Sequence, residues 1–173
     1  MASNMKTRGD RKILFLGNSI FLEDKIGLVI GSLLRGDLEK RGFEVEILER
    51  SWISLLDIIS GVKELIIVDS IIVDNPDDIG RVHLIDPKDF YGSHVKAPHS
   101  LSLADVLRIL EVYNLEPPEK IYVIGIGISD IQTLSEELSD TLKNKISEIC
   151  SDVIKIIDSI YTSNSSRKSE RML

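Results

Sequence analysis

Short, mainly apolar runs recur along the chain and are separated by longer segments. Such runs occupy residues 12–17, 64–73 and 120–124, the second of them interrupted by Asp69, whereas residues 43–48 alternate apolar with charged side chains. Apolar runs of this length are typical of strands buried on both faces, and alternation is typical of a strand with one wetter face. Together with a short segment at 80–85, the pattern predicts about five strands.

Between these runs, apolar residues recur at every third or fourth position, which is the helical period. The spacing predicts helices over residues 23–41, 52–59, about 100–113, and from 135 or 139 to about 157. Gly42 is expected to end the first helix. Residues 86–98 contain two prolines and no periodicity and predict a long loop, and Gly125-Ile126-Gly127 is expected to open another.

Strands that alternate with helices predict parallel pairing through right-handed crossovers. We therefore expect an α/β fold, a three-layer αβα sandwich with a mostly parallel sheet of about five strands. The 173 residues suffice for one domain with a hydrophobic core. We assign residues 11–158 to a single α/β domain, residues 1–10 to a flexible N-terminal arm and residues 159–173 to a flexible C-terminal tail.

Composition narrows the class of protein. Hydrophobic residues make up 43% of the chain, charged residues make up 28%, and the formal net charge is −7. A negative chain gains nothing from neutralising phosphates, so we expect no nucleic-acid partner. No apolar run reaches the ~18 residues of a membrane span, and the polar N-terminus is unlike a secretory signal. Cys150 is the single cysteine, which excludes an internal disulfide. We expect a cytoplasmic monomer.

Three side chains that can carry chemistry lie where ligands bind in an open α/β sheet, beyond the carboxyl ends of the strands. Asp24 follows the first strand, Asp69 lies in or at the end of the third, and His99 precedes a later helix. Each also has a structural interpretation. Asp24 could favour a helix dipole, Asp69 could be a paired buried carboxylate, and His99 could be a solvated loop or capping residue. His83, in an alternating strand, is expected to be exposed.

Two carboxylates and an imidazole suit a divalent transition metal such as nickel or zinc. The three residues do not form a local motif such as HExxH. The chain also lacks a GxSxG elbow, a Walker A loop and a GxGxxG fingerprint, so neither a serine hydrolase nor a nucleotide site is indicated. From the residues alone, the expectation is an α/β domain with an Asp/Asp/His site.

In four segments between Ile13 and Ile157, taken in order, the chain resembles the hydrogenase maturation endopeptidases, which remove a C-terminal extension from the large subunit of [NiFe] hydrogenases. The segments are Leu16 to Gly27 (LGNSIFLEDKIG), Ile66 to Ser70 (IIVDS), Pro98 to Leu107 (PHSLSLADVL), and Ile121 to Ile126 (IYVIGI) followed by Leu138-Ser139.

The resemblance implies that Asp24, Asp69 and His99 contact nickel that the precursor of the large subunit already carries. That precursor would be the partner, and any divalent metal held by the isolated protein would be adventitious. Cleavage of aspartic type, with a carboxylate as general base for water, and polarisation of the scissile carbonyl by the metal both remain open.

Several positions depart from the family pattern. Phe15 replaces the first glycine of the signature, Lys25 follows the acidic pair where relatives have a small residue, the turn after the second strand reads Glu49-Arg50-Ser51-Trp52, and Gly127 replaces an acid. These departures keep open a non-enzymatic docking or chaperone module for hydrogenase assembly. A small-molecule hydrolase or nucleosidase-like enzyme on a similar scaffold is a third, weaker alternative.

Overall fold

The computed structural model describes residues 10–49, 55–86 and 103–170. The strands in this part are β1 (Arg11–Leu16), β2 (Glu44–Leu48), β3 (Glu64–Ile72), β4 (Val82–Ile85) and β5 (Lys120–Ile128). The helices are α1 (Ile26–Lys40), α2 (Leu56–Ile59), the 3-10 turn η2 (Pro76–Asp78), α4 (Leu103–Val112) and α5 (Asp140–Glu170).

The strands form one five-stranded sheet in the order β2-β1-β3-β5-β4. β1 pairs in parallel with both β2 and β3, and β3 pairs in parallel with β5. Only the edge strand β4 runs antiparallel, against β5. The expected α/β class with a mostly parallel sheet is therefore confirmed.

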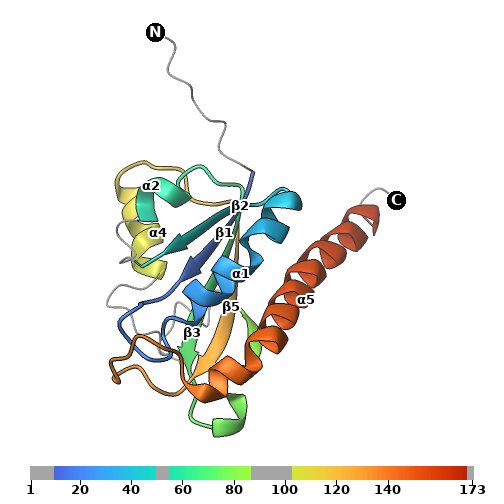
Figure 1. Cartoon of the computed structure of the whole chain (residues 1–173). Coiled ribbons are helices and arrows are strands. Elements are labelled where there is room, and N and C mark those ends of the chain that lie inside the picture. The colour runs from blue at the N-terminus through green and yellow to red at the C-terminus, as the bar shows by residue number, and fades with distance from the viewer. Residues whose placement is uncertain (1–9, 50–54, 87–102, 171–173) are drawn as a thin grey trace.

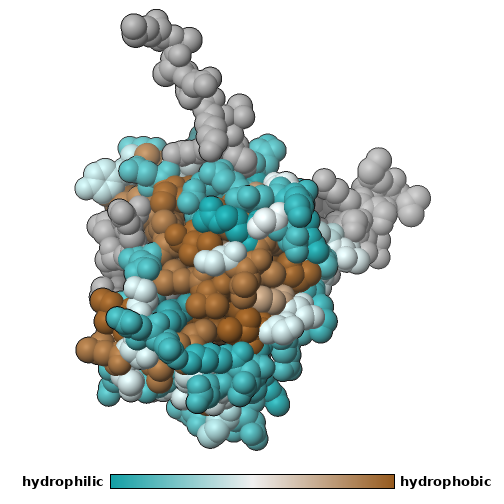
Figure 2. Space-filling view, in the orientation of Figure 1, coloured by the Kyte–Doolittle hydropathy of each residue, from teal (hydrophilic) through white to brown (hydrophobic). Residues whose placement is uncertain are grey.

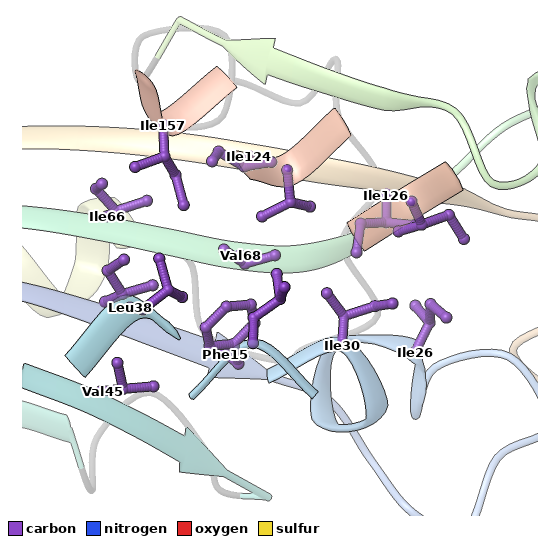
Figure 3. Close-up of a cluster of buried hydrophobic side chains, with 14 of the residues drawn as sticks. Phe15, Ile26, Ile30, Leu38, Val45, Ile66, Val68, Ile124, Ile126 and Ile157 are labelled. Atoms are coloured by element: carbon purple, nitrogen blue, oxygen red, sulfur yellow. The ribbon is translucent and has the colours of Figure 1, made fainter. Parts of the chain in front are cut away.

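Helices cover both faces of the sheet, so the domain has three layers with the sheet in the middle (Figure 1). The larger core lies under α1 and α5, where Phe15, Val68 and Ile126 of the sheet meet Ile30 and Ile157 of the two helices (Figure 3). The second core lies under α2 and α4. Because the strands alternate their side chains between these two cores, the central strands are apolar along most of their length.

Helix α1 approaches β1 unusually closely because it carries glycines on its inner side. A Cβ at Gly27 would overlap the backbone carbonyl oxygen of Leu16, and a Cβ at Gly31 would lie 2.6 Å from Cγ of Phe15. The bulk of Phe15, one of the departures from the family signature, is thus accommodated by a glycine on the facing helix.

Three boundaries differ from the sequence expectation. Helix α1 begins at Ile26 rather than Glu23, because residues 17–25 form a turn instead. The expected loop at Gly125 is wrong, since Gly125 and Gly127 lie inside β5 and pair with Asp69 and Ile71 of β3. Helix α5 continues to Glu170, well past the end of its apolar pattern. The division into arm, domain and tail stays a prediction.

The face that carries α1 and α5 has a broad apolar surface bordered by hydrophilic residues (Figure 2). Leu33 on α1 is 58% exposed, and Val29, Ile146, Cys150 and Ile154 are only partly buried. Among the described residues, no helix has both the length and the apolar character needed to span a membrane.

The packing of α1 on β1 predicts opposite effects for two glycine-to-alanine changes in one helix. Gly27→Ala should lower the free energy of unfolding by about 1–3 kcal/mol or more, because the helix must move off Leu16. Gly36→Ala should raise the free energy of unfolding by about 0.5–1 kcal/mol, since nothing lies within 4 Å of its added Cβ. Urea unfolding of both variants measures the difference, and equal midpoints would contradict the close packing.

Candidate functional site

The turn between β1 and α1, residues 17–25, is a compact loop closed by its own backbone. The N–H of Asn18 donates to the carbonyl of Asp24 at 3.3 Å, and the N–H of Ile26 donates to the carbonyl of Glu23 at 3.0 Å. A Cβ at Gly17 would lie 2.5 Å from the Asp24 carbonyl oxygen. A glycine is therefore needed for the turn to close, and its closure places the acidic pair at the end of β1.

Asp24 is buried at this edge, with 2% of its surface exposed, and it contacts β3. The hydroxyl of Ser70, which is fully buried, donates a hydrogen bond to Oδ1 of Asp24. Asp24 precedes the Lys25 cap of α1, and the first turn of that helix contains no acidic residue. The structure thus places Asp24 immediately before the helix and against the sheet, where it has a specific partner in β3 as well as the nearby helix N-terminus.

Asp69 is also fully buried, in β3. Its Oδ1 accepts a hydrogen bond of 2.9 Å from the backbone N–H of Ser70. Asp69 lies one residue beyond the last β1–β3 pair, Phe15 with Val68, and therefore beside the turn that follows β1. The two predicted carboxylates are brought to the same edge of the sheet, and Ser70 donates a hydrogen bond to each.

The position of these acids in the topology favours a ligand site. Helix α1, which follows β1, covers one face of the sheet. Helix α4, which comes between β3 and β5 in the sequence, covers the opposite face. The sheet order therefore reverses between β1 and β3, and open α/β sheets bind ligands in the crevice at such a switch point. Asp69 points toward the face of α4, because it alternates with Ser70 and shares the side of Ile67.

The third predicted residue, His99, lies outside the described residues, as does His94. Within the described ranges there is no group of three or more His, Cys, Asp or Glu side chains that could hold a metal. His99 precedes α4 in the sequence, and that helix packs on the face toward which Asp69 points. His83 is exposed on β4, as expected.

Glu23, the first member of the acidic pair, has a role that sequence reasoning missed. Its Oε2 accepts hydrogen bonds from the backbone N–H groups of Ser129, at 2.7 Å, and Asp130, at 2.8 Å. Its Oε1 accepts a bond of 2.8 Å from the Ser139 hydroxyl. Glu23 is 4% exposed. It therefore fastens the segment 129–139 to the turn after β1, and the two adjacent acids have different partners.

Lys25, on the other side of Asp24, is fastened to the same segment. Its buried amine donates to the backbone carbonyl of Ser135. Two backbone bonds reinforce the contact, from Leu22 to the Thr133 carbonyl at 2.8 Å and from Ser135 to the Ile20 carbonyl at 3.0 Å. The lysine that departs from the family pattern thus anchors a loop, and both neighbours of Asp24 are held by residues 129–139.

The fastened segment contains a second small hydrogen-bonded unit around Asp130. The Thr133 hydroxyl and the backbone N–H groups of Thr133 and Gln132 donate to its carboxylate and hold the pKa of Asp130 below its ordinary value. Nearby, Lys143 and more weakly Lys25 lower the pKa of Glu137. The segment is therefore ordered by ionised carboxylates at neutral pH.

Comparison with known proteins decides the family. The sequence model of a family described as hydrogenase maturation protease matches residues 46–156, which is more than half of the chain. The chain belongs to the hydrogenase maturation protease family. It is accordingly an enzyme of the protease class, as the resemblance implied. Asp69 and His99 lie within the matched range, and Asp24 precedes it.

Solved structures of hydrogenase maturation proteases have the same fold. The hydrogenase maturating endopeptidase HybD from E. coli is 26% identical, with a TM-score of 0.63 over 86% of this chain and 91% of that one. Two proteins from Thermococcus kodakarensis, the [NiFe] hydrogenase maturation proteases HybD and HycI, are 23% and 21% identical, each with a TM-score of 0.59. They cover 84% and 88% of this chain and 97% and 95% of their own. No curated protein sequence matches the chain.

Removing the hydrogen bonds of Glu23 is expected to loosen residues 129–139 of this maturation protease selectively. Glu23→Ala should increase hydrogen exchange in residues 129–139 and lower the free energy of unfolding by about 1–2 kcal/mol, because the N–H groups of Ser129 and Asp130 lose the charged acceptor that they share. Glu136→Ala, at an exposed position in the same segment, is the matched control. Unchanged exchange in Glu23→Ala would show that the backbone bonds alone hold the loop.

The lowered pKa of Asp130 predicts a pH dependence of the same segment. A carboxyl group whose pKa is lower in the folded state stabilises that state above its unfolded pKa of about 3.9, and the stabilisation is lost as the pH falls through the folded pKa. The amide resonances of Gln132 and Thr133 should therefore shift together below pH 4 in an NMR titration. The same shifts in Asp130→Asn would assign the titration to another group.

Proposed function

We propose that the protein removes a C-terminal extension from the nickel-loaded large-subunit precursor of a [NiFe] hydrogenase. In this proposal Asp24, Asp69 and His99 contact the nickel. The observation that carries it is the pair of buried carboxylates at the switch point of a maturation-protease fold, each hydrogen-bonded to Ser70. Names of similar proteins agree with such a substrate, since they include an endopeptidase and proteases of [NiFe] hydrogenase maturation.

Nickel enters this reaction as part of the substrate. Two carboxylates and one imidazole leave coordination positions open, and carboxylate and imidazole ligands both suit a divalent transition metal. A site with so few protein ligands needs the remaining ligands from the precursor. Contact with the nickel would therefore report that the precursor is loaded, and it would fix the scissile bond near the acids.

The chemistry of cleavage requires activation of water or of the scissile carbonyl. A carboxylate at the site can accept a proton from water as general base, and nickel held by the precursor can polarise the carbonyl. In both cases the role of this chain is to hold its carboxylates at fixed positions beside the bound metal. Asp24 and Asp69 meet that need because both are buried and both accept hydrogen bonds.

Three of the four departures from the family pattern have structural explanations that weaken the alternative of a non-enzymatic assembly module, and the fourth, the Glu49-Arg50-Ser51-Trp52 turn, lies outside the described residues from position 50 on. Lys25 anchors residue Ser135, and Gly31 makes room for Phe15. A side chain at position 127 would overlap the carbonyl oxygen of Asp78, so an acid there would not fit this packing. These residues adapt the fold without altering Asp24 or Asp69.

The proposal predicts that neutral replacements of the two acids stop cleavage. Asp24→Asn and Asp69→Asn preserve shape and remove the charge, and each should lower the cleavage rate by about 100-fold or more. The measurement is the intact mass of a nickel-loaded large-subunit precursor before and after incubation. Asp37→Asn, at an exposed aspartate of α1 that pairs with Lys40 at 3.6 Å, is the matched control and should cleave normally.

Two results would contradict the proposal in different ways. Normal cleavage by Asp69→Asn would remove the assignment of the acids while leaving the activity. No mass change with wild type, given a nickel-loaded precursor from the same cell, would remove the peptidase activity on this substrate, and tight binding of the precursor would then favour the assembly module.

A further inference from the structure

Ser70 is a buried polar residue whose presence the fold does not explain. It lies in the central strand β3, in the segment ELIIVDSII, where the other residues are apolar except Asp69 and Glu64 at the start of the strand. Ser70 itself is fully buried. A buried hydroxyl is unfavourable unless it is hydrogen-bonded, and an alanine of similar volume would fill the position equally well. The hydroxyl therefore points to a role beyond packing.

The partner of that hydroxyl is Asp24, and the direction of the bond is set by chemistry. The Ser70 hydroxyl is the donor, and Oδ1 of the Asp24 carboxyl group is the acceptor. A hydrogen bond to a charged acceptor is shorter and stronger than one between neutral groups. The bond joins residues 46 positions apart in the sequence, and both of them are buried.

The two ends of this bond differ in rigidity. Ser70 is held by ladder pairing with β5, where it lies opposite Ile126, and its backbone N–H is fixed on Asp69 at 2.9 Å. Asp24 lies in the turn 17–25, whose backbone is irregular. The carboxylate thus sits on a turn and takes its orientation from a strand. Because the same serine also donates to Asp69 through its backbone N–H, one residue holds both acidic side chains.

We propose that Ser70 is a positioning residue: its hydroxyl orients the Asp24 carboxylate, and its backbone N–H orients Asp69, for contact with the metal-bearing end of the precursor. The inference rests on the proposed function and deepens it. Ser70 touches neither the substrate nor the metal in this scheme and acts through the two acids. Groups that orient metal-contacting side chains typically contribute about 10–100-fold to affinity or activity.

The test compares variants that keep or lose the hydroxyl. Ser70→Ala should lower kcat for cleavage of the nickel-loaded precursor by about 10–100-fold with KM nearly unchanged, because binding surfaces outside the site are untouched. Ser70→Thr retains the hydroxyl and should restore most of kcat. Ser32→Ala, which removes a hydroxyl that donates to the Leu28 carbonyl at an exposed position of α1, should behave as wild type.

A merely structural role for the hydroxyl gives a different pattern. If it only tethers the turn to the sheet, Ser70→Ala will raise hydrogen exchange throughout residues 17–25 and raise KM, with kcat close to wild type, and this result would overturn the proposal. A kcat for Ser70→Ala within about threefold of wild type, or a failure of Ser70→Thr to recover, would also overturn it.

Two further outcomes, misfolding of Ser70→Ala and inactivity of the wild type, can be told apart from a failure of the Ser70 proposal. If Ser70→Ala does not fold, Ser70→Cys takes its place, since the thiol is close in size and a much weaker donor. Its kcat should then fall at least about 10-fold, and wild-type kcat would refute the role. If wild type itself leaves the precursor uncut, the proposed function fails and the role of Ser70 falls with it, whereas loss confined to the Ser70 variants leaves the proposed function intact.

Discussion

The site depends on how closely α1 lies against β1. Gly27 places the first turn of the helix on the Leu16 carbonyl, and Gly17 lets the chain fold back on the carbonyl of Asp24. With side chains at these positions the turn could not close in its present form. The constraint is steric and local, and it determines where the side chains of three consecutive charged residues, Glu23 to Lys25, project from the backbone.

Those three residues are all buried, which would be costly without partners for each of them. Glu23 accepts from the 129–139 segment, Lys25 donates to the Ser135 carbonyl, and Asp24 between them accepts from Ser70. The outer two therefore hold a loop, and the middle one contacts the sheet. An acidic pair that looks like two equivalent ligands is divided by the fold into one acid that holds a loop and one that contacts the sheet.

The site therefore has a rigid side and an adaptable side. β3 supplies Asp69 and Ser70, which lie just beyond its pairing with β1 and are held by continued pairing with β5, so those positions are well defined. The turn and the fastened loop present the exposed side chains Ile20 and Leu134, which are 59% and 68% accessible. A fixed pair of acids beside accessible loops is the arrangement that a protease for one large protein substrate requires, because chemistry needs precision and recognition needs surface.

Much of the fold was determined by sequence pattern. Apolar runs and helical spacing predicted the α/β class, the mostly parallel sheet and most elements, because burial on one or two faces leaves a periodic signature. The pattern failed at Gly125 and Gly127, which look like loop residues but lie in β5, where a Cβ at Gly127 would overlap the Asp78 carbonyl oxygen and a Cβ at Gly125 would press on the side chain of Ile85. The position of Asp24 and Asp69 at one edge of the sheet was also predicted from the sequence, since the carboxyl ends of parallel strands share one edge.

Tertiary structure alone decided which partner each acid has. The bond from Ser70 to Asp24 spans 46 positions, and that from Ser129 to Glu23 spans 106, so no local pattern could separate the two acids or single out the serine. His99 lies outside the described residues, and its role stays a prediction. The sequence by itself determined which residues could do chemistry and at which edge, because residue type and strand order are local properties. Only folding decided their partners, because hydrogen bonds form between atoms that are close in space, whatever their separation along the chain.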